Sequence, residues 1–218
     1  MNTTYEYRTD GAEIYAESFR IIREETDLAR FPDDVAAAVV RMVHAAAQTD
    51  LSSDVAFTPG VVAAARSALV AGAPVLCDST MVATGIIRSR LPRDNDVICH
   101  LGDPGLSDLA AELGTTKTAA AVEMWKPRLE GAVVAIGNAP TALFRLLEVV
   151  RDTGVKPAAV IGIPVGFVGA AESKQALADN PYGLEYLTVH GRRGGSAIAV
   201  AAVNAIASTA ETTNDARL

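Results

Sequence analysis

Five short apolar runs alternate with helical patterns from residue 74 onward, and this alternation constrains the fold more than any other feature of the chain. The runs cover residues 74–78, 96–101, 132–137, 158–165 and 186–190. Strands separated by helices pair in parallel, and right-handed crossovers place the helices on both faces of the sheet. The sequence therefore predicts an α/β fold of three αβα layers around a five-stranded parallel sheet.

Helical patterns fill the intervals between these runs. After the strands they cover residues 79–90, 104–113, 118–128, 140–152, 170–178 and 195–208. Three more helices, at 10–27, 33–48 and 59–71, precede the sheet, and we expect them to form an added N-terminal helical layer. The chain shows no internal repeat or low-complexity linker, so its 218 residues indicate a single domain over 1–218, with about 209–218 as a frayed tail.

Charge and cysteine usage narrow the class of protein. Acidic residues outnumber basic ones 26 to 19, for a net charge of −7, which argues against general nucleic-acid binding. No leader pattern opens the sequence and no apolar run is long enough to span a membrane, so we expect no membrane association and a cytoplasmic protein. Cys77 and Cys99 fall in predicted buried strands without metal-binding spacing, and we expect both to be core residues.

The strongest candidate for chemistry lies in the helix predicted at 33–48. Arg41, His44 and Gln48 are spaced i, i+3 and i+7, so they project from one face of that helix. A nearby guanidinium favours the neutral imidazole and keeps the pKa of the histidine near or below its usual value of about 6.5, which suits proton exchange. The alternative is a solvated helix face. His100 and His190, at strand ends, are more typical of structural histidines.

Parallel sheets bind ligands at the carboxyl ends of their strands, so the loops there are the next candidates for a binding site. Asp78 and Ser79 follow the first strand and fit as caps of the next helix. After the third strand, Asn138 is a candidate helix cap or carbonyl-binding side chain, and the amides of this turn are a candidate anion site. An ordinary strand-to-helix turn would have the same sequence.

The last two loops add positive charge. Ser173 and Lys174, after a glycine-rich stretch, are placed to hold a carboxylate. Arg192 and Arg193 precede the last helix and form a candidate anion cradle, although adjacent arginines are also common on solvated loops. Neither loop has the pattern of a nucleotide-binding phosphate loop. Together the loops indicate a ligand with several negative groups.

Longer stretches of the sequence, in order along nearly the whole chain, resemble the precorrin-8X methylmutase family of cobalamin biosynthesis. They are Tyr15-Ala16-Glu17-Ser18-Phe19-Arg20-Ile21-Ile22-Arg23, Arg41-Met42-Val43-His44-Ala45, Cys77-Asp78 with Met81-Val82, Gly137-Asn138-Ala139-Pro140-Thr141-Ala142-Leu143, Val165-Gly166-Phe167-Val168-Gly169-Ala170-Ala171-Glu172-Ser173-Lys174, and Gly194-Gly195-Ser196. A set of motifs of this length is specific.

The resemblance implies a flavodoxin-like fold, a homodimer, and an isomerase that moves a methyl group from carbon 11 to carbon 12 of precorrin-8X to give hydrogenobyrinate. It implies no redox or metal cofactor, and handover of the product to other enzymes of the pathway. The family's catalytic histidine falls on His44, and its substrate-contacting residues fall on Ser18 and Arg41. Because the substrate carries acetate and propionate arms, we also expect contacts from polar residues of the loops. These residues are Asn138, Ser173, Lys174, Arg192 and Arg193.

Three other functions stay open from the sequence. The first is a cobalt-precorrin-8 methylmutase of the anaerobic branch, although the resemblance is closer to the cobalt-free branch. The second is a corrinoid carrier that sequesters an intermediate without catalysis and does not need His44. The third is a flavodoxin-like module that binds a nucleotide or flavin, which the scarcity of aromatic residues and the lack of a phosphate loop weaken.

Overall fold

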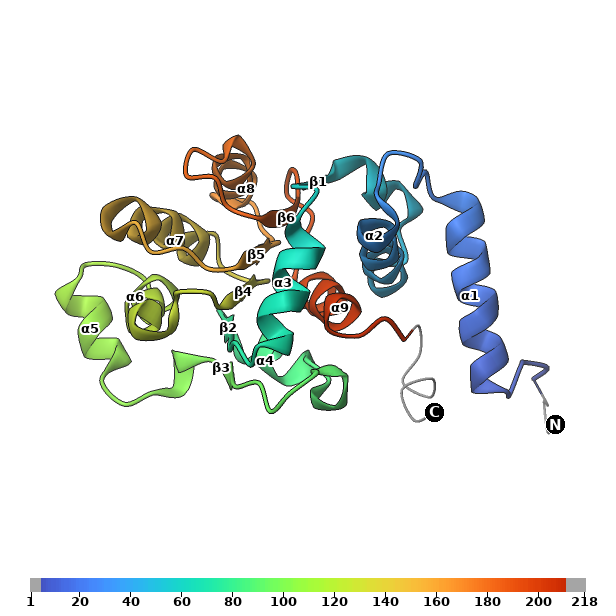
Figure 1. Cartoon of the computed structure of the whole chain (residues 1–218), viewed down its shortest axis with the longest axis horizontal. Helices are drawn as coiled ribbons and strands as arrows, with labels where there is room; N and C mark the ends of the chain where they lie inside the picture. The colour runs from blue at the N-terminus through green and yellow to red at the C-terminus, as the bar shows by residue number, and fades with distance from the viewer. Residues whose placement is uncertain (1–4, 211–218) are drawn as a thin grey trace.

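Buried apolar runs form a central sheet in the structure, a computed structural model that describes residues 5–210 (Figure 1). Its strands are β1 (Val55–Phe57), β2 (Val75–Cys77), β3 (Val97–Ile98), β4 (Val133–Ile136), β5 (Ala159–Gly162) and β6 (Tyr186–Val189). Every residue of β2, β4, β5 and β6 is buried. Continuous apolar runs of this kind are expected for strands that are covered on both faces.

The strand order is β1-β6-β5-β4-β2-β3. The five strands from β2 to β6 are parallel to one another, as the sequence predicts, but β1 is an additional edge strand that pairs antiparallel with β6. The prediction of five strands is therefore wrong by one. The sequence signal of β1 is weak because the strand has only three residues and only Val55 among them is buried.

The helices follow the predicted alternation. They are α1 (Gly11–Glu25), α2 (Asp33–Ala46), α3 (Val61–Val70), α4 (Thr80–Gly85), α5 (Leu106–Glu112), α6 (Lys117–Trp125), α7 (Pro140–Thr153), α8 (Ala170–Asp179) and α9 (Ser196–Ala207). Short 3-10 segments connect some of them: η1 (Thr49–Asp54), η2 (Arg88–Arg90), η3 (His100–Gly102) and η4 (Lys126–Arg128). No helix among the described residues is both long and apolar enough to cross a membrane.

Two hydrophobic clusters hold the layers together. On one face of the sheet, α3, α4 and α9 pack against Val133 and Ile161, with α2 outside them and α1 outermost (Figure 1). On the other face, α6, α7 and α8 pack against Val134 and Val160, and α5 lies outside α6. The predicted N-terminal layer of three helices is thus only partly right, since α3 packs directly against β4 and β5. The added layer consists of α1 and α2.

Two local expectations about the first crossover have different outcomes. Ser79 caps α4 as predicted, because its Oγ accepts a hydrogen bond from the amide of Val82 at 3.3 Å. The helix predicted at 79–90 is shorter, however, and resumes only as the 3-10 segment η2. The break falls where the amide of Ile87 donates to Oδ1 of Asn204 in α9, at 2.9 Å. A tertiary hydrogen bond thus replaces the helical one.

Cys77 is a core residue of a buried strand, as predicted, whereas Cys99 follows β3 and is only partly buried. Cys77 is buried within the core on the α9 side of the sheet, Cys99 packs against the same cluster, and both thiols are free. Burial raises the pKa of the Cys77 thiol well above its ordinary value, which makes this group unreactive. Most of the tail predicted at 209–218 lies outside the described residues.

Candidate active site

Arg41 and His44 lie on the face of α2 that packs against α1. The His44 ring is 5.1 Å from the ring of Phe19 and 5.6 Å from that of Tyr15, both in α1. The guanidinium carbon of Arg41 is 5.6 Å from the centre of the Phe19 ring. One aromatic wall therefore orients both side chains while His44 retains access to solvent. The shared face of Arg41 and His44 is confirmed.

Gln48 does not belong to that face. The helix ends at Ala46, and Ala47 takes a left-handed conformation with φ of 53°. The chain therefore turns away before Gln48, whose side chain instead accepts a hydrogen bond from Arg193 at 3.4 Å. The i+7 extension of the polar stripe is wrong because the helix stops too early to support it.

The surroundings of His44 favour a neutral imidazole. Partial burial lowers the pKa of His44, and the neighbouring cation of Arg41 lowers it further. The sequence anticipates the effect of Arg41 but not the larger effect of burial, which comes from the cover that α1 provides. A neutral imidazole offers one N–H donor and one acceptor nitrogen, so it can give a hydrogen bond or exchange a proton with a bound molecule.

Ser18 lies on α1 beside this wall. It is three residues from Tyr15 and adjacent to Phe19, and its side chain is half-buried. Its Oγ donates to the backbone carbonyl of Ile14 at 2.8 Å, which leaves the oxygen lone pairs able to accept another bond. Ser18, Arg41 and His44 are thus brought to one pair of helices. Tyr15 and Phe19, which the sequence analysis did not single out, carry the packing between them.

At the carboxyl ends of β2 and β4, the protein's own carboxylate occupies the predicted anion site. Oδ1 of Asp78 accepts the amide of Gly137 at 2.9 Å, and Oδ2 accepts those of Asn138 and Ala139 at 2.9 and 2.7 Å. These amides are therefore not open to another anion. Asn138 is not the helix cap either, since Ala139 holds that position. The Asn138 side chain is exposed instead.

Ser173 and Lys174 are completely buried. Oγ of Ser173 donates to the carbonyl of Ala170 at 3.1 Å, and Nζ of Lys174 donates to the carbonyl of Arg193 at 2.5 Å. Burial lowers the pKa of Lys174 to about 8, against the opposing effect of Asp54. This arrangement contradicts the expectation that the two residues contact substrate. Lys174 holds the loop between β6 and α9 in place instead, whereas the hydroxyl of Ser173 bonds within α8.

The two arginines of that loop have separate positions. Arg193 forms ion pairs with Asp50, at 2.8 Å, and with Asp54, so it is already engaged within the protein. Arg192 is exposed, and its guanidinium carbon is 5.3 Å from the centre of the Phe167 ring. Phe167 is itself 84% exposed at the tip of the loop after β5. The anion cradle predicted from both arginines is reduced to Arg192.

A groove of about 440 Å³ connects these loops with the end of α2. It is lined by residues that include Ala45, Gln48, Val165, Phe167, Arg192 and Ile198. The groove thus runs from the last turn of α2, the turn that also carries His44, to the exposed cation of Arg192, whereas the His44 ring itself faces α1. Its walls are mainly apolar, with charge at one end, as expected for a site that takes a flat, apolar ring with acidic arms.

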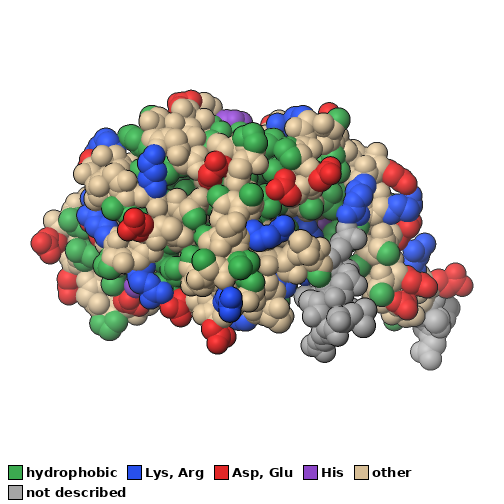
Figure 2. Space-filling view, in the orientation of Figure 1, with side chains coloured by type: hydrophobic (Ala, Val, Ile, Leu, Met, Phe, Trp, Pro, Cys, Tyr) green, Lys and Arg blue, Asp and Glu red, His purple; other side chains and the backbone are tan. Residues whose placement is uncertain are grey.

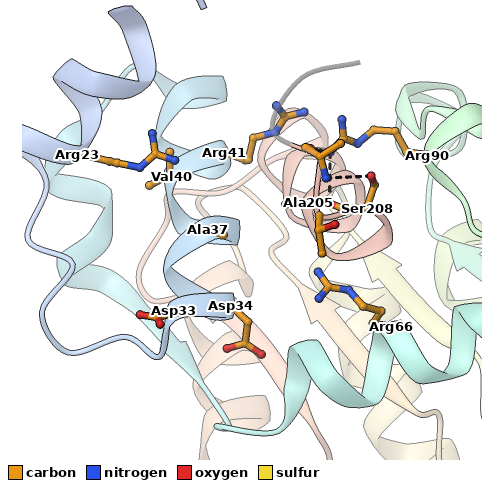
Figure 3. Close-up of a pocket in the computed structure, with 12 residues that line it drawn as sticks. Arg23, Asp33, Asp34, Ala37, Val40, Arg41, Arg66, Arg90, Ala205 and Ser208 are labelled. Atoms are coloured by element: carbon orange, nitrogen blue, oxygen red, sulfur yellow. Dashed lines mark hydrogen bonds between the residues drawn. The ribbon is translucent and has the colours of Figure 1, made fainter. Parts of the chain in front are cut away.

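A second hollow, of about 460 Å³, lies beside Arg41 between α1, α2, α3 and α9 (Figure 3). Figure 3 shows Arg66 opposite Asp34 at one end, and Arg41 and Arg90 toward the other. Arg66 and Arg90 donate to the carbonyls of Ile206 and Asn204, near the end of α9. They therefore compensate the carbonyl groups of that helix terminus. Charges of both signs are intermixed on the face in Figure 2.

Comparisons with known proteins identify the family of this chain. The family model described as precorrin-8X methylmutase matches residues 13–209. The chain is 57% identical to the precorrin-8X methylmutase of Sinorhizobium sp over 203 residues, 93% of this chain and 97% of that protein. It is 35% identical to the cobalt-precorrin-8 methylmutase of Priestia megaterium, over 91% of this chain and 88% of the other.

A solved structure of precorrin-8X methylmutase from Thermus thermophilus superposes with a TM-score of 0.81. It is 39% identical in sequence, and the match covers 90% of this chain and 95% of that one. The fold and the order of elements are therefore shared over most of both proteins. The chain belongs to the precorrin-8X methylmutase family.

Proposed function

We propose that this protein is an isomerase of cobalamin biosynthesis that converts precorrin-8X to hydrogenobyrinate by a methyl shift from carbon 11 to carbon 12. Family membership gives the reaction. The observation that carries the mechanism is the position of His44, which is oriented by an aromatic wall and lies next to a cation, in the turn of α2 from which an apolar groove extends. This combination suits a macrocyclic substrate with acidic arms.

In the proposed mechanism, His44 gives a proton or hydrogen bond to the macrocycle. A 1,5-sigmatropic methyl shift needs no nucleophile, because the methyl group migrates within the ring system as the π electrons rearrange. The protein has to hold the ring in one shape and change its electron distribution through a single donor. One histidine is sufficient for this, which fits a site whose polar loop residues are largely bound to one another.

The binding residues divide between the helices and the loops. We assign Arg41 and Arg192 to peripheral carboxylates, because guanidinium groups bind carboxylates in a bidentate geometry. Ser18 and Asn138 supply neutral polar contacts. Phe167 offers an exposed ring at the end of the groove, against which a flat macrocycle can stack.

The finer features of the fold and assembly are part of the same proposal. The parallel strands have the order β3-β2-β4-β5-β6 across the sheet. If these five strands are renumbered 1 to 5 along the chain, the order is 2-1-3-4-5, which supports a flavodoxin-like fold in one domain. We also propose a cytoplasmic homodimer that hands its product to other enzymes of the pathway. Apolar side chains at the surface support an interface, since Phe167 and Val168 are 84% and 89% exposed and Tyr15 is 46% exposed.

Two alternatives differ in substrate and in chemistry. A cobalt-precorrin-8 methylmutase would carry out the same shift on a cobalt-containing substrate, and the lower identity to the relative named for that reaction disfavours it. A corrinoid carrier would need the groove and Arg192 but not His44. The placement of His44 beside Arg41, with both side chains against the aromatic wall, favours catalysis.

The decisive experiment is the visible absorption spectrum of precorrin-8X incubated anaerobically with the purified protein. We expect the wild type to produce the hydrogenobyrinate spectrum, and His44→Ala to perturb the substrate spectrum without forming product. A wild type that only perturbs the spectrum would support the carrier. Conversion of cobalt-precorrin-8 alone would support the other methylmutase, and normal turnover by His44→Ala would contradict the role of His44.

A further inference from the structure

Asp78 is a buried carboxylate that the proposed mechanism does not use. It ends β2 and is 0% exposed. The chain continues from β2 to β3 on one side, whereas β4 pairs on the other side, so Asp78 lies where the strand order reverses. In open α/β sheets, the crevice at such a reversal is where ligands bind to backbone amides. Here the carboxylate of Asp78 takes that position.

Three hydrogen bonds connect Asp78 with the start of α7. They come from consecutive amides, those of Gly137, Asn138 and Ala139, at 2.7 to 2.9 Å. Burial raises the pKa of the Asp78 carboxyl, and the three amide bonds act in the opposite direction. A carboxylate that binds three successive amides fixes the backbone of the turn in one conformation.

The same turn is also packed tightly against α9. A Cβ atom added to Gly137 would lie 2.8 Å from Cα of Ser196, the first residue of α9, and 2.8 Å from Cγ2 of Val82. The hydroxyl of Ser196 is 3.4 Å from that of Ser79, the neighbour of Asp78. The ends of β2 and β4 and the start of α9 are therefore joined at one point. Asn138 projects from this point with its side chain exposed.

We propose that Asp78 is a positioning residue for substrate binding, which fixes the turn at 137–139 so that Asn138 is presented to the macrocycle. Asp78 itself touches no substrate. This inference rests on the proposed function for the identity of the substrate. It adds that the protein fills its own anion site, so a peripheral arm of the substrate meets the side chain of Asn138 instead of the backbone amides.

The test is the kinetics of Asp78→Asn, which keeps the shape of the side chain but replaces one acceptor oxygen with a donor. We expect KM for precorrin-8X to rise about tenfold or more while kcat stays within about threefold, because lost uniform binding changes KM alone. Amide hydrogen exchange at residues 137–139 should also increase about tenfold or more. An unchanged KM in folded Asp78→Asn would overturn the proposal.

Coupling to Asn138 separates positioning from a general loss of structure. Asn138→Ala should raise KM on its own, and adding Asp78→Asn to it should raise KM less than twofold further, since the two act through one contact. Fully additive effects would contradict the proposal. If Asp78→Asn does not fold, Gly137→Ala displaces the same turn while keeping the carboxylate, and an unchanged KM there would also contradict it.

Asn95 provides a matched control at the opposite, amino end of the parallel strands, just before β3 begins. It is also buried, and its Nδ2 donates to the carbonyls of Leu69 and Ala73, both at 2.8 Å. Asn95→Asp should lower the melting temperature without raising KM, and an equal rise of KM would overturn the proposal. Wild-type turnover tests the proposed function separately, whereas amide exchange in Asp78→Asn reports on the turn even if precorrin-8X is not the substrate.

Discussion

The pair of helices α1 and α2 and the loops at the carboxyl edge of the sheet use their polar residues in opposite ways. Arg41 and His44 are set against Phe19 and Tyr15, which orient both side chains while the His44 ring stays exposed. In the loops, Asp78, Lys174 and Arg193 are bound to other parts of the protein. The helices therefore present reactive groups to a ligand, whereas the polar side chains of the loops mainly fix the conformation of the loops themselves.

This difference follows from how each region satisfies the hydrogen bonds of its own backbone. An α-helix satisfies its own backbone, so a side chain on its surface is available for other contacts. A strand-to-helix loop leaves amides and carbonyls unsatisfied, and buried side chains must satisfy them. Lys174 binding the carbonyl of Arg193 is one such case, and Asp78 is another. Only Arg192 and Asn138 are exposed from among the predicted loop residues.

The largest effect should come from the helical region. Removing the proton donor in His44→Ala should lower kcat by about 100-fold or more, the usual contribution of general acid–base catalysis. Stability should change little, because the ring keeps solvent access and makes no hydrogen bond with any residue between 5 and 210. Kinetics and thermal unfolding, with His100→Gln as control, check this. His100 pairs with Asp103 instead, and an equal loss of kcat in the control would contradict the comparison.

Arg41 should give the next largest effect. A charged hydrogen bond contributes about 1.5–3 kcal/mol, so Arg41→Met should raise KM for precorrin-8X about tenfold to a hundredfold. Arg41→Lys should recover part of this loss, since it keeps the charge but not the planar group over Phe19. Steady-state kinetics measure both variants. An unchanged KM in Arg41→Met would mean that the cation acts only through His44.

The sequence predicts the helical region well because its information is local. The spacing of Arg41 and His44 places them on one face whatever surrounds the helix, and the resemblance adds Ser18. Gln48 was misplaced since the helix ends at Ala46, and the turn at Ala47 has no glycine to signal it. The short strand β1 was missed because its pairing with β6 depends on contacts across more than 120 positions of the chain.

The loops could not be predicted from their composition. Ser173, Lys174, Arg192 and Arg193 are equally polar in the sequence, and only packing determines which of them are buried. Arg193 lies next to Arg192 but is turned toward Asp50 and Asp54, residues 139 or more positions away. The sequence contained one usable signal, since a glycine-rich loop permits close approach of a neighbouring loop. Gly194 fits it, because an added Cβ would lie 2.5 Å from the carbonyl oxygen of Pro164.

The two neighbouring arginines sharpen the comparison within the loops. Arg192→Ala should raise KM about fivefold to tenfold and leave stability unchanged, since the side chain is exposed. Arg193→Ala should lower the free energy of unfolding by about 1 kcal/mol, the upper end for a partly exposed ion pair, with a smaller change of KM. Kinetics and chemical denaturation of both variants distinguish these outcomes. Equal KM effects would mean that both arginines bind the substrate.

The smallest effect concerns the charge of His44. Burial and Arg41 lower the pKa of His44 below its ordinary value, so folding favours the neutral ring. Its contribution to stability is therefore fully present above the unfolded pKa of about 6.5 and is lost as the pH falls through the lower folded value. Arg41→Met removes the cation and should move the folded pKa up, toward 6.5.

Nuclear magnetic resonance titration of the His44 ring proton, assigned by its absence in His44→Ala, measures that pKa directly. A higher pKa of His44 in Arg41→Met would show that Arg41, on the same face of α2, lowers the pKa of the proton donor. An unchanged pKa would mean that the cover of Tyr15 and Phe19 is sufficient by itself. Arg41 would then serve only the substrate's carboxylate, and the two regions would differ less than proposed, since each would bind an acidic arm through one arginine beside an aromatic ring.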